Sequence, residues 1–471
     1  MTPGNVKGTS RHIYWRGVSL ARVEFLLAIV CFRTTLDLCY VFYLATAFVD
    51  DPITPMPLLF AAEQYALSWL ALICVASLVP FRKEDLSGVF FLAAMAFLYV
   101  PMTSLTGLNG ARSFSDVVLV ACAVLTSAAI ISVSTQATSK TTPRGWNELR
   151  VTVTISAIAV SAFVVWSIAS GAVFSASASL QDIYLHRSDA SEILDVGPLA
   201  YFNLWAQKVF NPYLLAVGMF YRRRALVAVC IGLQVYFFLI TQHRSHLFVP
   251  VMIYFVYFLY TRRVGIMHIY LLMSGALLTV LTAASAFALF EVEGVPSILI
   301  RRAFFVAPSV TSDWLAYFHD NPHVYFADNL LKAYVENEYT GENLPSLMST
   351  LIFGGQPFGF NVGIVGAGYA HLGLIGVVLY AATLGALVRS INHLIYRGLP
   401  AFLSAALLFE PFRTTWADTD LPTAILSHGI LIGTILLFLT APNRPVLARA
   451  SRAKGGKVPG PERRCRPWAR G

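Results

Sequence analysis

The sequence predicts an all-α polytopic membrane protein of about twelve transmembrane helices with two larger periplasmic loops. Of its 471 residues, 57% are hydrophobic and only 13% are charged, and the mean hydropathy is +0.65. Soluble domains carry about 25% charged residues. Apolar runs long enough to cross a hydrocarbon layer of ~30 Å recur from residue 20 to residue 440, so no room is left for a separate soluble core.

Each apolar run is expected to form a helix, because backbone groups in lipid must find hydrogen-bond partners within their own segment. The runs lack the alternation of the roughly ten-residue strands of an outer-membrane barrel. The predicted spans are 22–48, 57–80, 87–106, 116–134, 151–172, 201–220, 225–241, 247–260, 267–290, 366–388, 400–412 and 423–440. The span 400–412 is short and ends in Glu410-Pro411, so a broken or re-entrant segment is the alternative there.

The distribution of Lys and Arg predicts a cytoplasmic N-terminus. In that orientation 25 of the 34 Lys and Arg residues fall in cytoplasmic segments, and every short basic loop lies on one side. Residues 1–440 are expected to form one transmembrane bundle. The Arg-rich residues 441–471, which contain Gly and Pro and no apolar periodicity, are expected to be a disordered basic cytoplasmic tail.

Most of the net charge of +9 is therefore a topology signal, and no nucleic-acid partner is expected. The first apolar stretch is long and lacks a small-residue cleavage pattern, so it should remain as the first helix. None of the six cysteines lies in a predicted outside loop, and no disulfide framework is expected. No CxxC, Walker-type or HExxH motif occurs, so we expect no cofactor and no metal.

Ionisable groups inside the predicted spans are few, and each is costly to place in lipid. Arg33 and Asp37 are four residues apart and hence on one helix face, so we expect them to pair with each other. Glu63 and Lys208 are expected to hold helices together, with a place in a polar cavity as the alternative.

The two large predicted outside loops, 173–200 and 291–365, carry most of the distinctive residues, and long ordered loops are usually functional. The first contains Tyr184 and Arg187 among several acidic residues, and the second opens with Arg301-Arg302. A solvated acidic loop and an aromatic loop at the membrane interface are the plainer interpretations of these compositions.

Two further arginines, Arg244 and Arg413, lie at predicted outside ends of helices. An arginine at such a place can simply extend its charged head to the interface. Together with the loop arginines, however, they form a set of outside guanidiniums suited to hold a phosphate or pyrophosphate through paired hydrogen bonds.

Residues 299–318 contain Arg302, Pro308 and several aromatics. This segment resembles the large periplasmic loop of bacterial O-antigen and capsule oligosaccharide repeat-unit polymerases. Residues 361–376 are similar to the family's entry into the following helix, although Gly368 replaces the acidic residue often found before the aromatic, here Tyr369. No acid or base role is therefore expected at that place.

Two shorter segments extend the resemblance to about residues 180–420. Residues 241–248 resemble the family's arginine-containing turn between two middle helices. Arg187 with Gly197 resembles its Arg-to-Gly motif, and the nine intervening residues are one fewer than the usual pattern.

The resemblance implies a glycosyltransferase at the periplasmic face of the bacterial inner membrane. It would transfer a growing glycan from one undecaprenyl pyrophosphate carrier onto a new lipid-linked repeat unit. The implied catalytic residues are Arg187, Arg302 and Arg301, and the implied substrate-binding residues are Arg244, Arg413, Tyr184, Asn361 and Tyr369. The implied partners are undecaprenyl-pyrophosphate-linked oligosaccharide, membrane lipid, a chain-length regulator and a flippase.

The acceptor hydroxyl would also need a general base. The candidates left open by the sequence are His186, Asp189, Glu192, Asp195, Asp313, His319 and Glu336. Three other functions stay open as well: an O-antigen ligase of similar topology, a polysaccharide flippase or other transporter, and a non-enzymatic assembly partner of a polysaccharide machine.

Overall fold

The computed structural model describes residues 9–79, 86–136, 148–172, 174, 190, 193–194, 197–243, 245–262, 265–286, 294–328, 331–354 and 359–442. It is 80% helical, and the described residues form no strand. The predicted all-α fold class is confirmed. The described part of the chain contains eight helices long and apolar enough to cross a membrane, so the protein is a multi-pass membrane protein.

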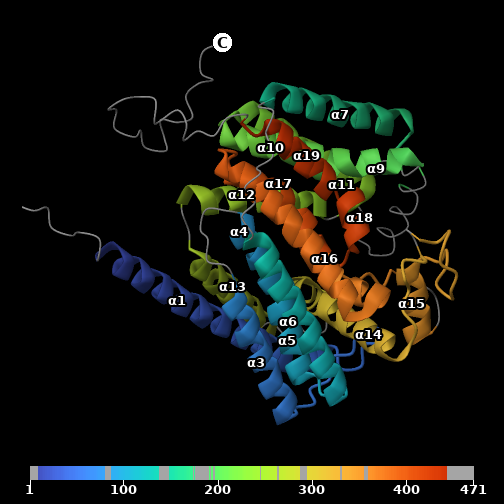
Figure 1. Ribbon diagram of the computed structural model, residues 1–471. Coiled ribbons are helices and arrows are strands. Elements are labelled where there is room, and N and C mark those ends of the chain that lie inside the picture. Colours follow the sequence, from blue (N-terminus) through green and yellow to red (C-terminus); the bar gives the residue numbers. More distant parts are fainter. Residues whose placement is uncertain are drawn as a thin grey trace, which may run out of the picture.

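The helices of the N-terminal part follow one another along the chain (Figure 1), and two π-helical turns, η1 and η2, lie inside longer helical runs. They are α1 (Thr9–Cys39), η1 (Tyr40–Leu44), α2 (Ala45–Ala47), α3 (Ala62–Leu78), α4 (Leu86–Ala94), η2 (Met95–Tyr99), α5 (Val100–Leu108), α6 (Phe114–Gln136) and α7 (Leu149–Ala169).

The C-terminal part continues in the same way. Its helices are α9 (Pro198–Trp205), η3 (Ala206–Phe210), α10 (Asn211–Phe220), α11 (Arg224–Thr241), α12 (Ser245–Arg262), α13 (Ile266–Ala286), η5 (Ser297–Phe305), α14 (Val306–Asp320), α15 (Leu344–Phe353), α16 (Ile364–Tyr396), α17 (Ala401–Ala417), α18 (Leu421–Leu426) and α19 (Ile430–Thr440). In Figure 1, α16 and α17 lie between a group formed by α7, α10, α11 and α19 and a group formed by α1, α3, α5 and α6.

Eight of the twelve predicted spans coincide with the eight apolar helices. The other four also form helices, namely α3, the run from α9 through α10, α12 and α17, but these are shorter or less apolar. The alternative of a broken segment at 400–412 is wrong, because α17 continues through Pro411 to Ala417.

The predicted pair inside the first span is confirmed. Arg33 Nε lies 2.7 Å from Asp37 Oδ1, and the Arg33 side chain is fully buried. Ser68 accepts a hydrogen bond from Arg33, and the Trp69 ring lies 5.1 Å from its guanidinium carbon. These partners join α1 to α3, and a charge that is costly in lipid is thereby compensated. Glu63 is exposed, and Lys208 Nζ lies 3.5 Å from His428 Nδ1.

Three segments between helices gather at one end of the bundle. Arg301 of η5 pairs with Asp51 at 2.7 Å, and Arg112 pairs with Asp313 of α14. The segment that follows α2, the turn between α5 and α6, and the region 294–328 therefore contact one another. All three had been predicted to lie on the outside.

The region predicted as the loop 291–365 contains three helical segments, because η5, α14 and α15 fall within it. Of the predicted loop 173–200, most residues lie outside the described ranges. The predicted disordered tail also lies outside them from residue 443 onward.

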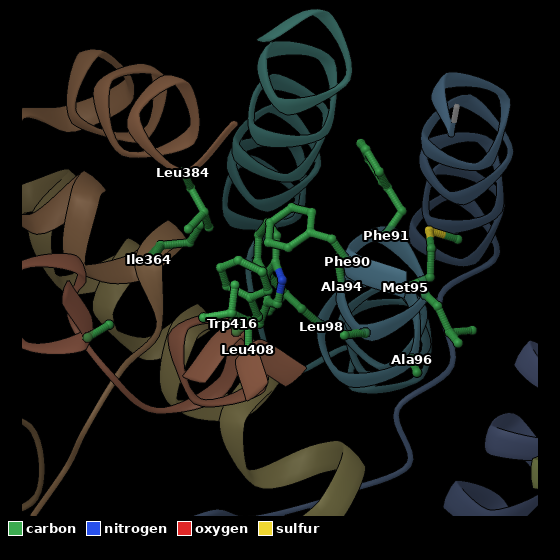
Figure 2. Packing of buried hydrophobic residues seen from close by; sticks show 14 of the residues in the cluster. Phe90, Phe91, Ala94, Met95, Ala96, Leu98, Ile364, Leu384, Leu408 and Trp416 are labelled. Atoms are coloured by element: carbon green, nitrogen blue, oxygen red, sulfur yellow. The ribbon is translucent and has the colours of Figure 1, made fainter. Parts of the chain in front are cut away.

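Buried aromatic residues hold the end of α17 in place. The Phe90 ring of α4 lies 5.2 Å from the Trp416 ring and 4.8 Å from the Phe412 ring. Figure 2 shows Trp416 packed beside Phe90 and Leu408 in this cluster. Trp416 and Leu408 have no exposed surface, so their packing defines where the residues at the end of α17 lie.

Candidate functional site

A cavity of about 220 Å³ lies at the end of the bundle where the connecting segments gather. Its wall comes from four segments that are distant in the sequence, and the lining residues are Ile53, Thr54, Arg302, Ala303, Val306, Ala307, Val310, Gly359, Phe360, Asn361, Arg413, Ala417 and Asp418. Three of the predicted site residues, Arg302, Asn361 and Arg413, are thus brought together.

The two consecutive arginines of η5 point to different surroundings. Arg301 is buried, donates to Asp51 and to Thr54 Oγ1 at 2.7 Å each, and stacks over the Phe48 ring at 4.3 Å. Arg302 is exposed at the cavity and forms no hydrogen bond or ion pair with any described residue. Arg301 therefore holds the 48–54 segment, whereas the guanidinium of Arg302 is available for a ligand.

Arg413 reaches the cavity from α17 already paired with an acidic residue. Its Nε and Nη2 donate to the two carboxylate oxygens of Glu410 at 2.9 and 3.0 Å. This planar pairing orients the guanidinium and leaves Nη1 without a partner among the described residues. Arg413 can therefore still donate hydrogen bonds to an anion through Nη1.

Asn361 is positioned by a close contact between the chain before α16 and the end of α17. A Cβ atom at Gly363 would lie 2.1 Å from the carbonyl oxygen of Trp416. Only glycine permits so close an approach. The contact places Asn361 on the same wall as Arg413.

Asp418 is a cavity residue that the sequence reasoning missed. It caps the end of α17, where its backbone N–H donates to Thr414 O at 2.9 Å, and its carboxylate accepts from Thr419 Oγ1 at 3.3 Å. Asp418 is an exposed residue on the cavity wall, and desolvation by the surrounding protein raises the pKa of its carboxyl above the ordinary value. The nearby Arg413 opposes the rise and Glu410 adds to it. Its place five residues after Arg413, at a predicted outside helix end, is the signal that could have found it.

The small-residue segment at the start of α16 forms a sharp break. Gly373 has φ +62° and ψ −147°, a conformation that suits glycine, and Leu372 is also non-helical. A Cβ at Gly376 would lie 1.8 Å from the oxygen of Gly368, so the first turns of α16 fold back against the continuing helix. The carbonyls of Ala370 and His371 accept hydrogen bonds from residues 324 and 325 at 2.9 and 3.2 Å.

Tyr369 lies in this first segment and is not brought to the cavity. Its hydroxyl is 3.5 Å from His319 Nδ1, and its ring lies 5.7 Å from the ring of His323. Tyr369 is buried, so its position indicates a role in packing around the break in α16.

The other predicted site residues, Arg187, Tyr184 and Arg244, lie outside the described residues. The same holds for four of the candidate bases, His186, Asp189, Glu192 and Asp195. Of the remaining candidates, Asp313 is paired with Arg112, His319 faces Tyr369, and Glu336 is exposed. None of these three lines the cavity.

The polar part of the cavity wall combines two guanidiniums, one carboxamide, one hydroxyl and one carboxylate. Such a wall can bind an anion through the arginines and place a carboxylate next to it. Within the described ranges, no group of three or more His, Cys, Asp or Glu side chains could hold a metal ion. Comparison with protein-family models, with curated proteins and with solved structures found no match for this chain.

Proposed function

We propose that the protein is a bacterial polymerase that joins undecaprenyl-pyrophosphate-linked oligosaccharide repeat units at the periplasmic face of the inner membrane. The observation that carries the proposal is Arg302, which is exposed at a cavity without a partner among the described residues, beside Arg413 and Asn361. An unpaired guanidinium at a polar cavity is a binding group for phosphate.

The chemistry of the proposed reaction matches these groups. The bond that breaks joins the anomeric carbon of the glycan to a lipid pyrophosphate, and negative charge develops on the leaving oxygens. Preorganised cationic donors aimed at developing charge stabilise such a transition state. Arginine also stays charged at every physiological pH.

The size of the cavity fits part of such a substrate. Pockets for whole drug-sized ligands measure about 300–1,000 Å³. A cavity of about 220 Å³ is smaller, so it would hold the pyrophosphate and the adjoining sugar while the lipid lies in the bilayer and the glycan extends outward.

The proposal includes a topology and partners. Four helices beyond the eight apolar ones would also cross the membrane, which gives about twelve spans with the N-terminus in the cytoplasm and the cavity in the periplasm. A flippase would deliver the lipid-linked units, and a chain-length regulator would act on the same glycan.

The direct test uses purified protein in lipid vesicles with synthetic lipid-linked repeat units. We expect the units to be lengthened without ATP or nucleotide sugar, because the pyrophosphate bond supplies the driving force. The Arg302→Ala variant should leave them unextended. A requirement for a nucleotide sugar would contradict the proposal, since that donor is cytoplasmic.

A gene deletion distinguishes the polymerase from an O-antigen ligase and a flippase. Loss of a polymerase should convert a ladder of surface glycan into one short band, because single repeat units are still flipped and transferred. Loss of a ligase would instead leave long chains on the carrier. Loss of a flippase would leave the units on the cytoplasmic leaflet.

A further inference from the structure

The acidic residues around the cavity differ in whether they form an ion pair with an arginine. Asp51 accepts from Arg301 at 2.7 Å, and Glu410 accepts from both Nε and Nη2 of Arg413. Asp418 forms no ion pair with the described residues, and the one side-chain hydrogen bond it accepts from them comes from Thr419. Of these three carboxylates, Asp418 alone is both cavity-lining and unpaired.

Asp418 shares the cavity with the arginine assigned to the leaving group. Arg302 comes from η5 and Asp418 from the end of α17, and both line the same small volume. A proton acceptor and an anion-binding group in one cavity can act on the two reacting partners of a single displacement.

We propose that Asp418 is the general base that accepts the proton of the acceptor hydroxyl, an inference that rests on the proposed function. The hydroxyl proton passes to the carboxylate as the hydroxyl oxygen bonds to the anomeric carbon of the donor glycan. The bond from that carbon to pyrophosphate breaks, and its electron pair leaves with the lipid pyrophosphate, which Arg302 binds. The proton on Asp418 then leaves to solvent.

The electrostatic surroundings suit this role. Desolvation at the cavity wall raises the pKa of Asp418, and a carboxylate with a higher pKa is a stronger base. The charged groups that act on it are Arg413 and Glu410 from α17 and Lys208 from η3, with Arg302 across the cavity. Since a raised pKa keeps the carboxyl protonated to higher pH, the rate should fall as the pH drops through that pKa.

The test is the extension assay with the isosteric Asp418→Asn variant. We expect the rate to fall roughly 100-fold or more, the usual contribution of a general base. The acidic limb of the rate against pH should disappear, while the affinity for the lipid-linked unit and the melting temperature stay at the wild-type values. Asp418→Glu, which keeps a carboxylate, should recover part of the rate. Asp320→Asn is the matched control, because Asp320 is exposed at the end of α14 and does not line the cavity.

Three outcomes would overturn the inference. An Asp418→Asn variant that extends chains at the wild-type rate, or keeps the acidic limb, excludes Asp418 as the base while the proposed function stands. A variant that loses affinity together with rate assigns Asp418 to substrate binding instead. A wild-type protein that extends no lipid-linked unit removes the proposed function and this inference with it.

Discussion

At the scale of single residues, the structure separates two neighbouring arginines that look alike in the sequence. Arg301 is enclosed by Asp51, Thr54 and the Phe48 ring, whereas Arg302 opens onto the cavity without a partner among the described residues. Replacing Arg302 should therefore impair activity, whereas replacing Arg301 should lower stability.

Arg302→Lys should impair chain extension nearly as much as Arg302→Ala, with protein abundance unchanged. Lysine keeps the charge but lacks the planar fork that binds phosphate through two hydrogen bonds. The extension assay and quantitative immunoblotting measure the two effects. Lys332→Ala is the control, because Lys332 is an exposed cation outside the cavity. Full activity of the lysine variant would argue for a generic charge requirement.

Arg301→Ala should instead lower stability, because it removes the cation that pairs with Oδ2 of the mostly buried Asp51 carboxylate. The loss should be about 1–3 kcal/mol, as for a buried charged group that loses its hydrogen bond. Thermal unfolding in detergent measures it, and Asp51→Asn in the Arg301→Ala background should recover part of the loss. A variant of unchanged melting temperature that no longer extends chains would identify Arg301 as the ligand.

At the scale of secondary-structure elements, the break in α16 and the end of α17 build the cavity wall together. The glycines at 363, 368, 373 and 376 serve either a close backbone contact or a positive φ. The carbonyls of Ala370 and His371 at the break accept hydrogen bonds from the backbone of the 324–325 segment, so the break is a supported part of the fold.

Gly376→Ala should destabilise the protein, because the added methyl group would lie 1.8 Å from the oxygen of Gly368. Overpacking of this kind costs about 1–3 kcal/mol. Melting temperature and yield after purification measure the effect. Gly275→Ala in α13 is the matched control, since a Cβ there meets nothing within 4 Å and alanine favours the helix. Equal stability of the two variants would show that the fold-back at Gly368 does not form.

At the scale of the whole molecule, ion pairs bring the segments at one end of the bundle together. Arg301 with Asp51 and Arg112 with Asp313 join segments that the distribution of basic residues had assigned to the same side. The arginines of the cavity lie at this end, so the orientation of the bundle decides which compartment supplies the substrate.

Reporter fusions test that orientation. A reporter that is active only in the periplasm should be active when fused after Gly197 or Gly341 and silent after Arg224 or Arg397, because the latter two belong to the basic loops. Reporter activity in intact cells, normalised to fusion abundance, is the measurement. The opposite pattern would show that the cavity faces the cytoplasm.

The sequence by itself determined the properties that depend on neighbouring residues and on composition. Apolar runs predicted twelve helices, and eight of these are long and apolar enough to cross a membrane, because each helix satisfies its own backbone in lipid. The spacing of Arg33 and Asp37 predicted their pair, because four residues make one helical turn. These features need no knowledge of the other helices.

Only the tertiary structure decided which residues meet at the cavity. Arg302, Asn361 and Asp418 come from separate parts of the chain, and their proximity depends on the packing of Trp416 and on the close approach at Gly363. Local periodicity carries no information on such long-range contacts, since they arise from the packing of side chains between helices. For the same reason it could not tell that Arg301 would find Asp51 while Arg302 would face the cavity.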